Sequence, residues 1–276
     1  MAIRQEPLQR QPGYVSAQNI SHASFKALYA LHHSRRFRWL RRKIISSGKT
    51  RLSILELGCN DATSLDYVPV AIDRYVGFDA GWQSGRKDGV AYGLEAARQR
   101  YAGIEGIEFH RSNDYRDILA LSGTFDFAFV LETFEYLDPS KLESYISALA
   151  DKAWPSGQLV STMPNEKGIA VLLKHLGSRI SGVRRSQYSP WELALAALGR
   201  VRSIPRSARG RKGFDYQRIA ELAQKHFQYV RLEPVEPSFL PCSMSLNIGL
   251  VASHGIIDPA RTVPPTSLNY KCEAMI

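Results

Sequence analysis

The chain has 276 residues, of which 44% are hydrophobic, and this is enough for one large α/β domain with additions. It contains no run of about 18 apolar residues, so the sequence predicts no membrane-spanning helix. Met1–Arg10 is polar and charged, so we expect no secretory signal. Cys59, Cys242 and Cys272 have no disulfide-framework or metal-ligand spacing, which favours a cytoplasmic location.

The net charge of +10 is unevenly distributed. Residues 1–51 contain 11 Lys or Arg and one acid, and residues 168–213 contain 10 Lys or Arg and one acid. Residues 52–167 between them contain 10 basic and 18 acidic residues. The basic segments are either solvated faces or contacts for an anionic partner such as phosphate, lipid headgroups or RNA.

The basic N-terminal segment, 1–51, contains a predicted helix over 24–45. Its apolar residues recur at near-helical spacing, with arginines on the opposite side. They are Phe25, Leu28, Leu31, Phe37, Leu40 and Ile44.

From residue 52 the pattern alternates between strands and helices. We expect strands over 53–57, 74–79, 106–114, 124–132 and 158–165, with helices near 61 and over 87–102, 115–123 and 139–154. A helix over 214–227 and strands over 229–236 and 243–253 follow. This alternation predicts a parallel sheet covered by helices on both faces, in one domain over 52–253 with a tail at 254–276.

An insert at 168–213 interrupts this domain. Its first half predicts a helix with one apolar side, and "SPWE" from Ser189 predicts a capped second helix. The apolar side consists of Ile169, Leu172, Leu173, Leu176 and Ile180. The insert is either a lid on the site or a pair of interfacial helices on an anionic membrane, with Arg206, Arg209, Arg211 and Lys212 as the cations.

Four acids stand at or beside the expected strand ends: Glu56, Asp79, Asp114 and Glu132. Ligands of open parallel sheets bind at the carboxyl ends of the strands. Each acid could instead cap a helix. Asp79 follows Gly58 by 21 residues, the spacing of a carboxylate that binds ribose hydroxyls.

The turn after Gly58 disfavours a dinucleotide. The residues that follow do not form G-x-G-x-x-G, and a carboxylate at Asp61 would repel a pyrophosphate at the helix start. A cationic ligand with ribose and adenine, such as S-adenosylmethionine, fits the acidic rim better. The residues that follow are Cys59, Asn60, Asp61, Ala62 and Thr63.

The segments "ILELGCNDA", "YVGFDAG", "FHRSND", "FAFVLETFEYLDP" and "GQLVSTMPN" resemble, in this order, the motifs of class I S-adenosylmethionine-dependent methyltransferases. The resemblance covers 52–165, and 214–253 follows in order. It implies a Rossmann-like, doubly wound sheet of seven strands, mostly parallel, with an antiparallel last strand. Asn60 and Ala62 replace the family's later glycines, and Asn tolerates the left-handed backbone that such a turn needs.

The resemblance also implies cofactor-binding roles. Glu56 orients the turn and the methionine amino end, Gly58 and Cys59 let the backbone approach, and Asp79 takes the ribose hydroxyls. Asn113 or Asp114 contacts the adenine edge, and Leu131 and Glu132 face the methyl group and the acceptor. Asn60 and Ala80 complete the predicted set.

The predicted catalytic residues are Glu132, Glu135 and Tyr136, because a hydroxyl acceptor needs a group that removes its proton. Their segment resembles the E-x-x-E-H motif of ubiquinone-pathway O-methyltransferases, which is associated with a divalent ion. Tyr136 stands in place of the His, so we expect no metal. Glu135 could equally be a solvated carboxylate at a helix start.

The sequence therefore predicts a methyltransferase that O-methylates a small-molecule, glycan or lipid-linked acceptor. One alternative is an RNA methyltransferase, favoured by aromatics among the basic residues, such as Phe37, Trp39, Tyr188 and Trp191. Another is a catalytically silent partner subunit. The expected location is the cytoplasm, at the inner face of a membrane if the insert touches lipid.

Overall fold

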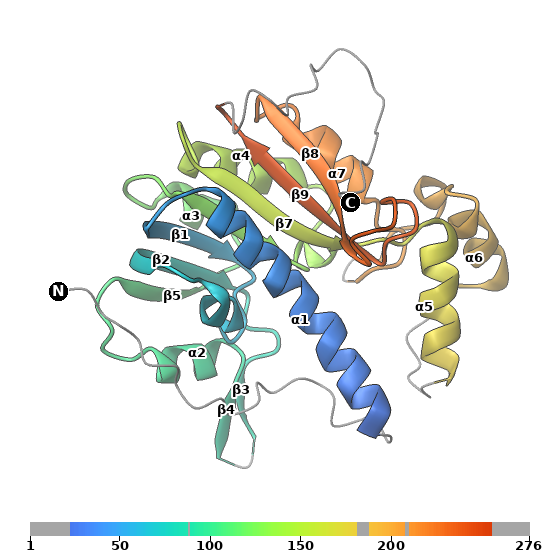
Figure 1. Cartoon of the computed structure of the whole chain (residues 1–276), viewed down its shortest axis with the longest axis horizontal. Coiled ribbons are helices and arrows are strands. Elements are labelled where there is room, and N and C mark those ends of the chain that lie inside the picture. Colours follow the sequence, from blue (N-terminus) through green and yellow to red (C-terminus); the bar gives the residue numbers. More distant parts are fainter. Residues whose placement is uncertain (1–22, 88, 181–187, 208–209, 256–276) are drawn as a thin grey trace.

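A computed structural model describes residues 23–87, 89–180, 188–207 and 210–255 (Figure 1). Of residues 23–33 and 179–180 it describes the backbone alone. The main strands are β1 (Arg51–Leu57), β2 (Ala71–Asp79), β5 (Ile107–Arg111), β6 (Phe127–Leu131), β7 (Gln158–Pro164), β8 (Tyr229–Glu236) and β9 (Asn247–Ser253).

These strands form one seven-stranded sheet in the order β5-β2-β1-β6-β7-β9-β8. The pairs β1–β2, β1–β6, β2–β5 and β6–β7 are parallel, whereas β9 runs antiparallel to both β7 and β8. The predicted fold is therefore confirmed: a Rossmann-like, doubly wound and mostly parallel sheet with an antiparallel last strand.

Two apolar layers bury the faces of the sheet (Figure 1). On one face pack α3 (Tyr115–Leu119), α4 (Leu142–Lys152) and α7 (Tyr216–Ala223). On the other face lie α1 (Ala23–Ser46), η2 (Thr63–Tyr67) and α2 (Leu94–Arg100). Residues of β6 alternate between the layers, with Ala128 and Val130 in the first and Phe127 and Phe129 in the second. This is the pattern of a central strand buried on both sides.

Helix α1 is fastened to the far edge of the sheet. Its Trp39 side chain donates a 3.0 Å hydrogen bond from Nε1 to Glu233 of β8, and Lys43 donates to the same carboxylate at 2.7 Å. A Cβ atom at Gly249 of β9 would lie 2.3 Å from the Trp39 ring, so only glycine leaves room for it. The carboxyl-terminal half of α1 is therefore packed against the fold.

The helix expected over 87–102 begins late. The strands β3 (Gly85–Lys87) and β4 (Val90–Tyr92) instead pair antiparallel here, and α2 starts at Leu94. Gly89 lies between the two strands at φ +79°, and Gly93 precedes the helix at φ +62°. Left-handed glycines interrupt a right-handed helix, so the expected start was wrong.

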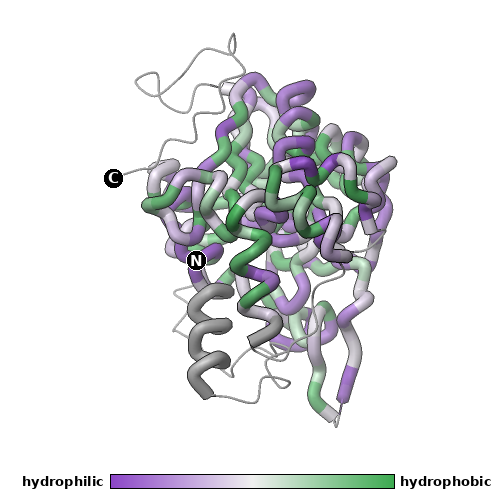
Figure 2. The backbone as a smooth tube through the Cα atoms, turned by 90° about the vertical axis from the view of Figure 1, so that its right-hand side faces the viewer, coloured by the Kyte–Doolittle hydropathy of each residue, from purple (hydrophilic) through white to green (hydrophobic). Residues whose placement is uncertain are grey.

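The insert consists of α5 (Gly168–Ile180), α6 (Pro190–Ala197) and the turn η4 (Val201–Ser203), beside the sheet in Figure 1. The capping box predicted at Ser189 and Glu192 is present. Figure 2 shows hydrophobic residues along the backbone of α5. The exposed ones are Ile169, Leu172, Leu173 and Leu176, whereas the Ile180 side chain lies outside the described residues.

Cysteine usage differs from the expectation. Cys59 is a buried free thiol, but Cys242, in the connection between β8 and β9, is disulfide-bonded. The absence of any disulfide was therefore a wrong expectation, and the cysteines give no support for a reducing compartment.

Candidate functional site

The predicted site residues lie at one edge of the sheet. Strand β1 pairs with β2 on one side and with β6 on the other. The strands that follow β1 in the chain are therefore added first on one side of it and then on the other, which makes β1 the switch point of the strand order. A crevice at such a switch point is where open α/β sheets bind ligands. Glu56 and Asp79 belong to the ends of β1 and β2, and Glu132 directly follows β6.

The turn after β1 is tight and fully hydrogen-bonded at its start. The backbone N–H groups of Gly58 and Cys59 both donate to the carbonyl of Phe78, at 2.7 and 3.1 Å. Gly58 has φ +78°, and a Cβ there would lie 2.1 Å from Thr133 Oγ1. This glycine is therefore required by the turn and by Thr133, and the Cys59 side chain is buried in the core.

The turn continues through two residues that are left-handed without being glycine. Asn60 has φ +48° and Ala62 has φ +55°, as expected of positions where the resembling family carries glycine. Between them Asp61 accepts hydrogen bonds from Thr63, at 3.2 Å from the backbone nitrogen and 2.7 Å from Oγ1. A carboxylate thus covers the start of η2, where a pyrophosphate would need free N–H groups.

Asp79 faces this turn from the end of β2. Its Oδ2 accepts from the Asn60 N–H at 3.1 Å, and its Oδ1 accepts from the Gly81 N–H at 2.6 Å. The residue is half-exposed, as is its neighbour Ala80. Each carboxylate oxygen has a second lone pair, so Asp79 is fixed in place and can still accept two ligand hydroxyls.

Glu56 lies behind the turn and is buried. Its Oε2 accepts from Tyr75 Oη at 2.7 Å and also from Ser64 of η2. Burial raises the pKa of Glu56 to about 7, against the lowering effect of these two bonds. Both bonds use the same oxygen, which leaves Oε1 for a further donor.

Asn113 and Asp114 follow β5. Asp114 caps α3 by accepting from the Arg116 N–H at 3.0 Å, and the Asn113 carbonyl accepts from the Tyr145 hydroxyl. The capping alternative for Asp114 is therefore realised, and the side chain remains partly exposed beside the edge of the sheet.

Glu132 directly follows the buried Leu131 at the end of β6 and has φ +54°. Left-handed backbone at a residue other than glycine is strained and is common at functional sites. The Glu132 N–H donates to the Thr162 carbonyl of β7 at 2.8 Å. Its side chain is only 7% exposed and lies against Arg211, with Oε2 at 2.9 Å from Nη2.

Glu135 is fully buried in the turn η3 (Phe134–Tyr136). Its Oε1 lies 3.7 Å from Arg211 Nε, which is too long for a hydrogen bond. Burial, and next the neighbouring Glu132, raise the pKa of Glu135 to about 8, although Arg211 lowers it. The alternative of a solvated carboxylate is therefore wrong for Glu135.

Tyr136 is partly buried beside this pair. Burial raises the pKa of its hydroxyl, and the charge of Arg211 acts in the opposite direction. The structure thus gathers the three predicted catalytic residues around one arginine.

Arg211 is the main residue that the sequence did not assign to the site. It comes from the loop that closes the insert, together with Arg206, which donates to the Phe134 carbonyl at 3.0 Å. Lys212 pairs with Glu192 of α6 at 2.7 Å. These three cations are bound within the protein, so they are not the free membrane contacts that we expected, and Arg209 lies outside the described residues.

Within the described part of the chain, no helix is long and apolar enough to cross a membrane. The same residues contain no group of three or more His, Cys, Asp or Glu arranged to hold a metal ion.

No protein-family model matches the chain, and no curated protein matches it. Solved structures similar to it include the methyltransferase domain of a bacterial Hen1 (14% identity, 80% of this chain and 98% of that chain, TM-score 0.49). Another is the N-methyltransferase NodS from Bradyrhizobium japonicum WM9 (14% identity, 78% of this chain and 94% of that chain, TM-score 0.44). A third is the magnesium protoporphyrin IX methyltransferase from Synechocystis PCC 6803 with bound SAH (15% identity, 82% of this chain and 84% of that chain, TM-score 0.49). At such low identity and TM-score, the fold assignment rests on the strand order of this chain itself.

Proposed function

We propose that the chain is a methyltransferase that uses S-adenosylmethionine and methylates a hydroxyl group of its acceptor. The observation that carries the proposal is the placement of two carboxylates on either side of β1. Asp79 lies half-exposed at the end of β2, and Glu132 follows the end of β6. One serves the cofactor and the other serves the acceptor.

The residues of the first side fit the cofactor. Asp79 has lone pairs left for two ribose hydroxyls, and Glu56 Oε1 is left for the amino group of the methionine part. Asn113 and Asp114 are the candidates at the adenine edge. Bound S-adenosylmethionine supplies a methyl group on a sulfonium, whose carbon–sulfur bond breaks as the oxygen–carbon bond of the product forms.

Glu132 is the group that takes the acceptor proton. Its Oε2 is held by Arg211, and its Oε1 is buried without a hydrogen-bond partner. This oxygen can accept a hydrogen bond, and then the proton, from the hydroxyl group of the substrate that is methylated. Tyr136 borders the same space, and Glu135 remains protonated at neutral pH because its pKa is raised to about 8.

The test begins with isothermal titration of S-adenosylmethionine, of its product S-adenosylhomocysteine, and of NAD. We expect both methionine derivatives to bind and NAD not to bind. Labelled methyl transfer into fractionated lysate of the source organism then identifies the acceptor class. Label in RNA would overturn the small-molecule or glycan assignment, and cofactor binding without any transfer would indicate a silent partner subunit.

We also propose that the insert rests on an anionic membrane surface through the apolar side of α5, with the net charge of +10 of the whole chain as the attraction in place of Arg206, Arg211 and Lys212. The supporting observation is a set of large apolar side chains left exposed: Leu173 (51%), Leu176 (56%), Trp191 (72%), Leu198 (74%) and Phe239 (71%). Exposed apolar residues on a helix are typical of interfacial contacts.

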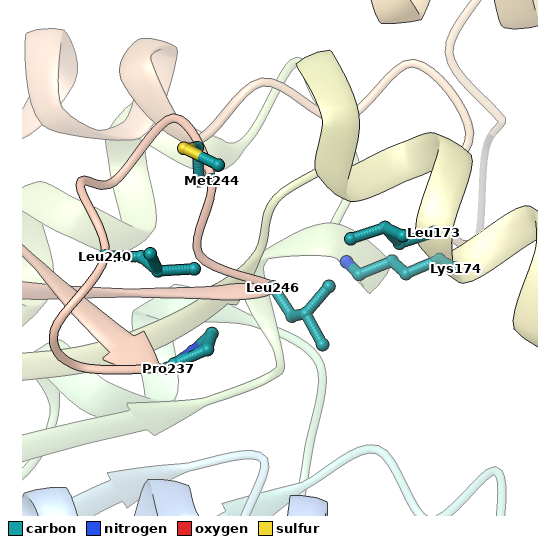
Figure 3. A pocket seen from close by; sticks show the side chains of 6 residues that line it. All are labelled: Leu173, Lys174, Pro237, Leu240, Met244 and Leu246. Carbon is teal, nitrogen blue, oxygen red and sulfur yellow. The ribbon is translucent and has the colours of Figure 1, made fainter.

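Beside α5, an apolar hollow of about 210 Å³ lies against the β8–β9 connection (Figure 3). It is lined by Leu173, Lys174, Pro237, Leu240, Met244 and Leu246. Flotation with anionic and neutral liposomes tests the membrane proposal. We expect anionic liposomes to bind the protein and Leu173→Ser with Leu176→Ser to abolish binding, while SAH affinity stays the same. Wild-type protein that stays unbound at low salt would favour a plain lid.

A further inference from the structure

Unpartnered polar atoms gather between two segments of the described chain. In the segment after β6 these are Glu132 Oε1 and both carboxylate oxygens of Glu135. In the closing loop of the insert they are Arg211 Nε, Arg206 Nε and Ser207 Oγ. All are buried and none has a hydrogen-bond partner.

The two segments face each other directly. Arg211 reaches both carboxylates, Arg206 donates to the Phe134 carbonyl, and the Gly210 N–H donates to the Glu135 carbonyl at 3.3 Å. The unpartnered atoms therefore belong to one cluster.

A buried polar atom without a partner costs about 1–3 kcal/mol, so a group of them calls for an explanation. The other side of the site shows that the protein is able to satisfy such atoms. Glu56 and Asp79 both accept hydrogen bonds from within the protein. A bound molecule that completes the cluster accounts for this difference.

The chemistry of the cluster restricts what that molecule is. Carboxylate oxygens need hydrogen-bond donors, and guanidinium N–H groups need acceptors. A hydroxyl group is both at once. An anionic group would meet the charged carboxylate of Glu132 in a buried site, and an apolar ring without hydroxyls would leave every atom of the cluster unsatisfied.

We infer that the acceptor carries two neighbouring hydroxyl groups, bound between Glu132 and Arg211, with Arg211 as the residue that selects for the pair. This rests on the proposed function. One hydroxyl donates to Glu132 Oε1, and the second accepts from the guanidinium of Arg211. A sugar and a catechol share this chemistry, and the two are separated by experiment.

The test uses matched probes and the full chain loaded with SAH. The probes are cis-1,2-cyclohexanediol against cyclohexanol, and catechol against phenol, with binding measured by saturation-transfer difference NMR. We expect the diol of at least one pair to bind at least tenfold more tightly than its mono-ol. A diol preference in the cyclohexane pair indicates a sugar-like acceptor. A preference for catechol over phenol indicates a catechol acceptor.

Three variants connect the probes to the cluster. Arg211→Met should remove the preference for the diol, and Arg211→Lys, which keeps the charge without the planar fork, should retain part of it. Lys212→Met is the matched control from the same loop, because Lys212 pairs with Glu192, and it should keep the full preference. Thermal melting of each variant reports whether it is folded.

Equal binding of diols and mono-ols, no binding of any probe, or a preference that survives in folded Arg211→Met would overturn the inference. Calorimetry with SAH keeps the two proposals apart. Failure of SAH to bind overturns the proposed function, whereas normal SAH binding without a diol preference overturns the inference alone.

Discussion

The cofactor side and the acceptor side of the candidate site use their polar groups differently. On the cofactor side, Asp79 and Glu56 each accept two hydrogen bonds from nearby residues. On the acceptor side, Glu132 and Glu135 keep buried oxygens without partners. The first side is organised before any ligand binds, whereas the second still has hydrogen-bonding groups to satisfy.

The difference also follows the chain. The hydrogen bonds that fix Glu56 and Asp79 on the cofactor side all lie within residues 56–81, between residues at most 19 apart in sequence. The acceptor side joins Glu132 to Arg211, which are 79 residues apart. A cofactor shared by many enzymes suits a fixed cradle, and a particular acceptor suits a segment added to the fold.

The largest effect should come from Glu132→Gln. The variant keeps the shape of the side chain but removes the carboxylate that we propose as the group that takes the acceptor proton. We expect the initial rate of labelled methyl transfer to fall at least 100-fold, within the range for general-base groups. SAH affinity measured by calorimetry should stay within about twofold, since Glu132 serves the acceptor side.

Glu135→Gln is the matched comparison. It is an isosteric change in the same cluster, but Glu135 is already protonated at neutral pH because of its raised pKa. We expect its rate to fall less than tenfold. A fall of less than tenfold for Glu132→Gln as well would remove the support for proton transfer by this segment.

Asp79→Asn should give the next largest effect, on the cofactor side. Two ligand hydroxyls would lose a charged acceptor, and a hydrogen bond to a charged group is worth about 1.5–3 kcal/mol. SAH affinity should therefore fall about 10- to 150-fold in calorimetry. Asp61→Asn is the control, because Asp61 only caps Thr63, and its affinity should stay within about twofold. Equal losses in both variants would sink the ribose assignment.

The sequence was sufficient for the fold because local signals agreed. Strand β6 is a run of five apolar residues, Phe127–Leu131, buried in full, and β2 ends at the predicted Asp79. The hairpin of β3 and β4 was missed because Gly89 and Gly93 were included in one expected helix, although both have a positive φ that interrupts a helix.

The site was predictable only where the order of parallel strands by itself brings residues together. Acids at strand ends were found because parallel strands bring their carboxyl ends to one edge. Arg211 was not, because its partners depend on how the insert folds back over η3. A count of charges indicated a basic face, but a count cannot show that Arg206, Arg211 and Lys212 already have partners inside the protein.

Glu135→Gln should also change the pH dependence of stability. Its folded-state pKa of about 8 lies above its ordinary value of 4.5, so the folded state holds the proton more tightly than the unfolded state does. The wild-type protein should lose stability as pH rises from 4.5 to 8, and Glu135→Gln should not share that loss. Melting temperatures should be similar at pH 5, with the variant higher at pH 8.5.

Glu143→Gln provides a control of opposite sign. Its hydrogen bond from Lys225 lowers the pKa of the exposed Glu143, so the stability it contributes is present above its ordinary pKa and lost at lower pH. This variant should be no more stable than the wild type at pH 8.5. A Glu135→Gln curve parallel to the wild type at every pH would show that Glu135 is ionised in the folded protein.

The smallest effect should come from Ala62→Gly, in the turn of the cofactor side. Ala62 has φ +55°, and relief of left-handed strain is worth about 1–2 kcal/mol. Its buried methyl group contributes about 0.8 kcal/mol, and the freer unfolded glycine costs about 0.4–1 kcal/mol. These contributions nearly cancel, so chemical denaturation should show a change below about 1 kcal/mol. Ala62→Val adds a β-branched side chain at the same φ, and it should destabilise the fold clearly and weaken SAH binding. A turn that tolerates valine as well as glycine would show that its backbone is not held as described, and the contrast between an organised cofactor side and an incomplete acceptor side would then disappear.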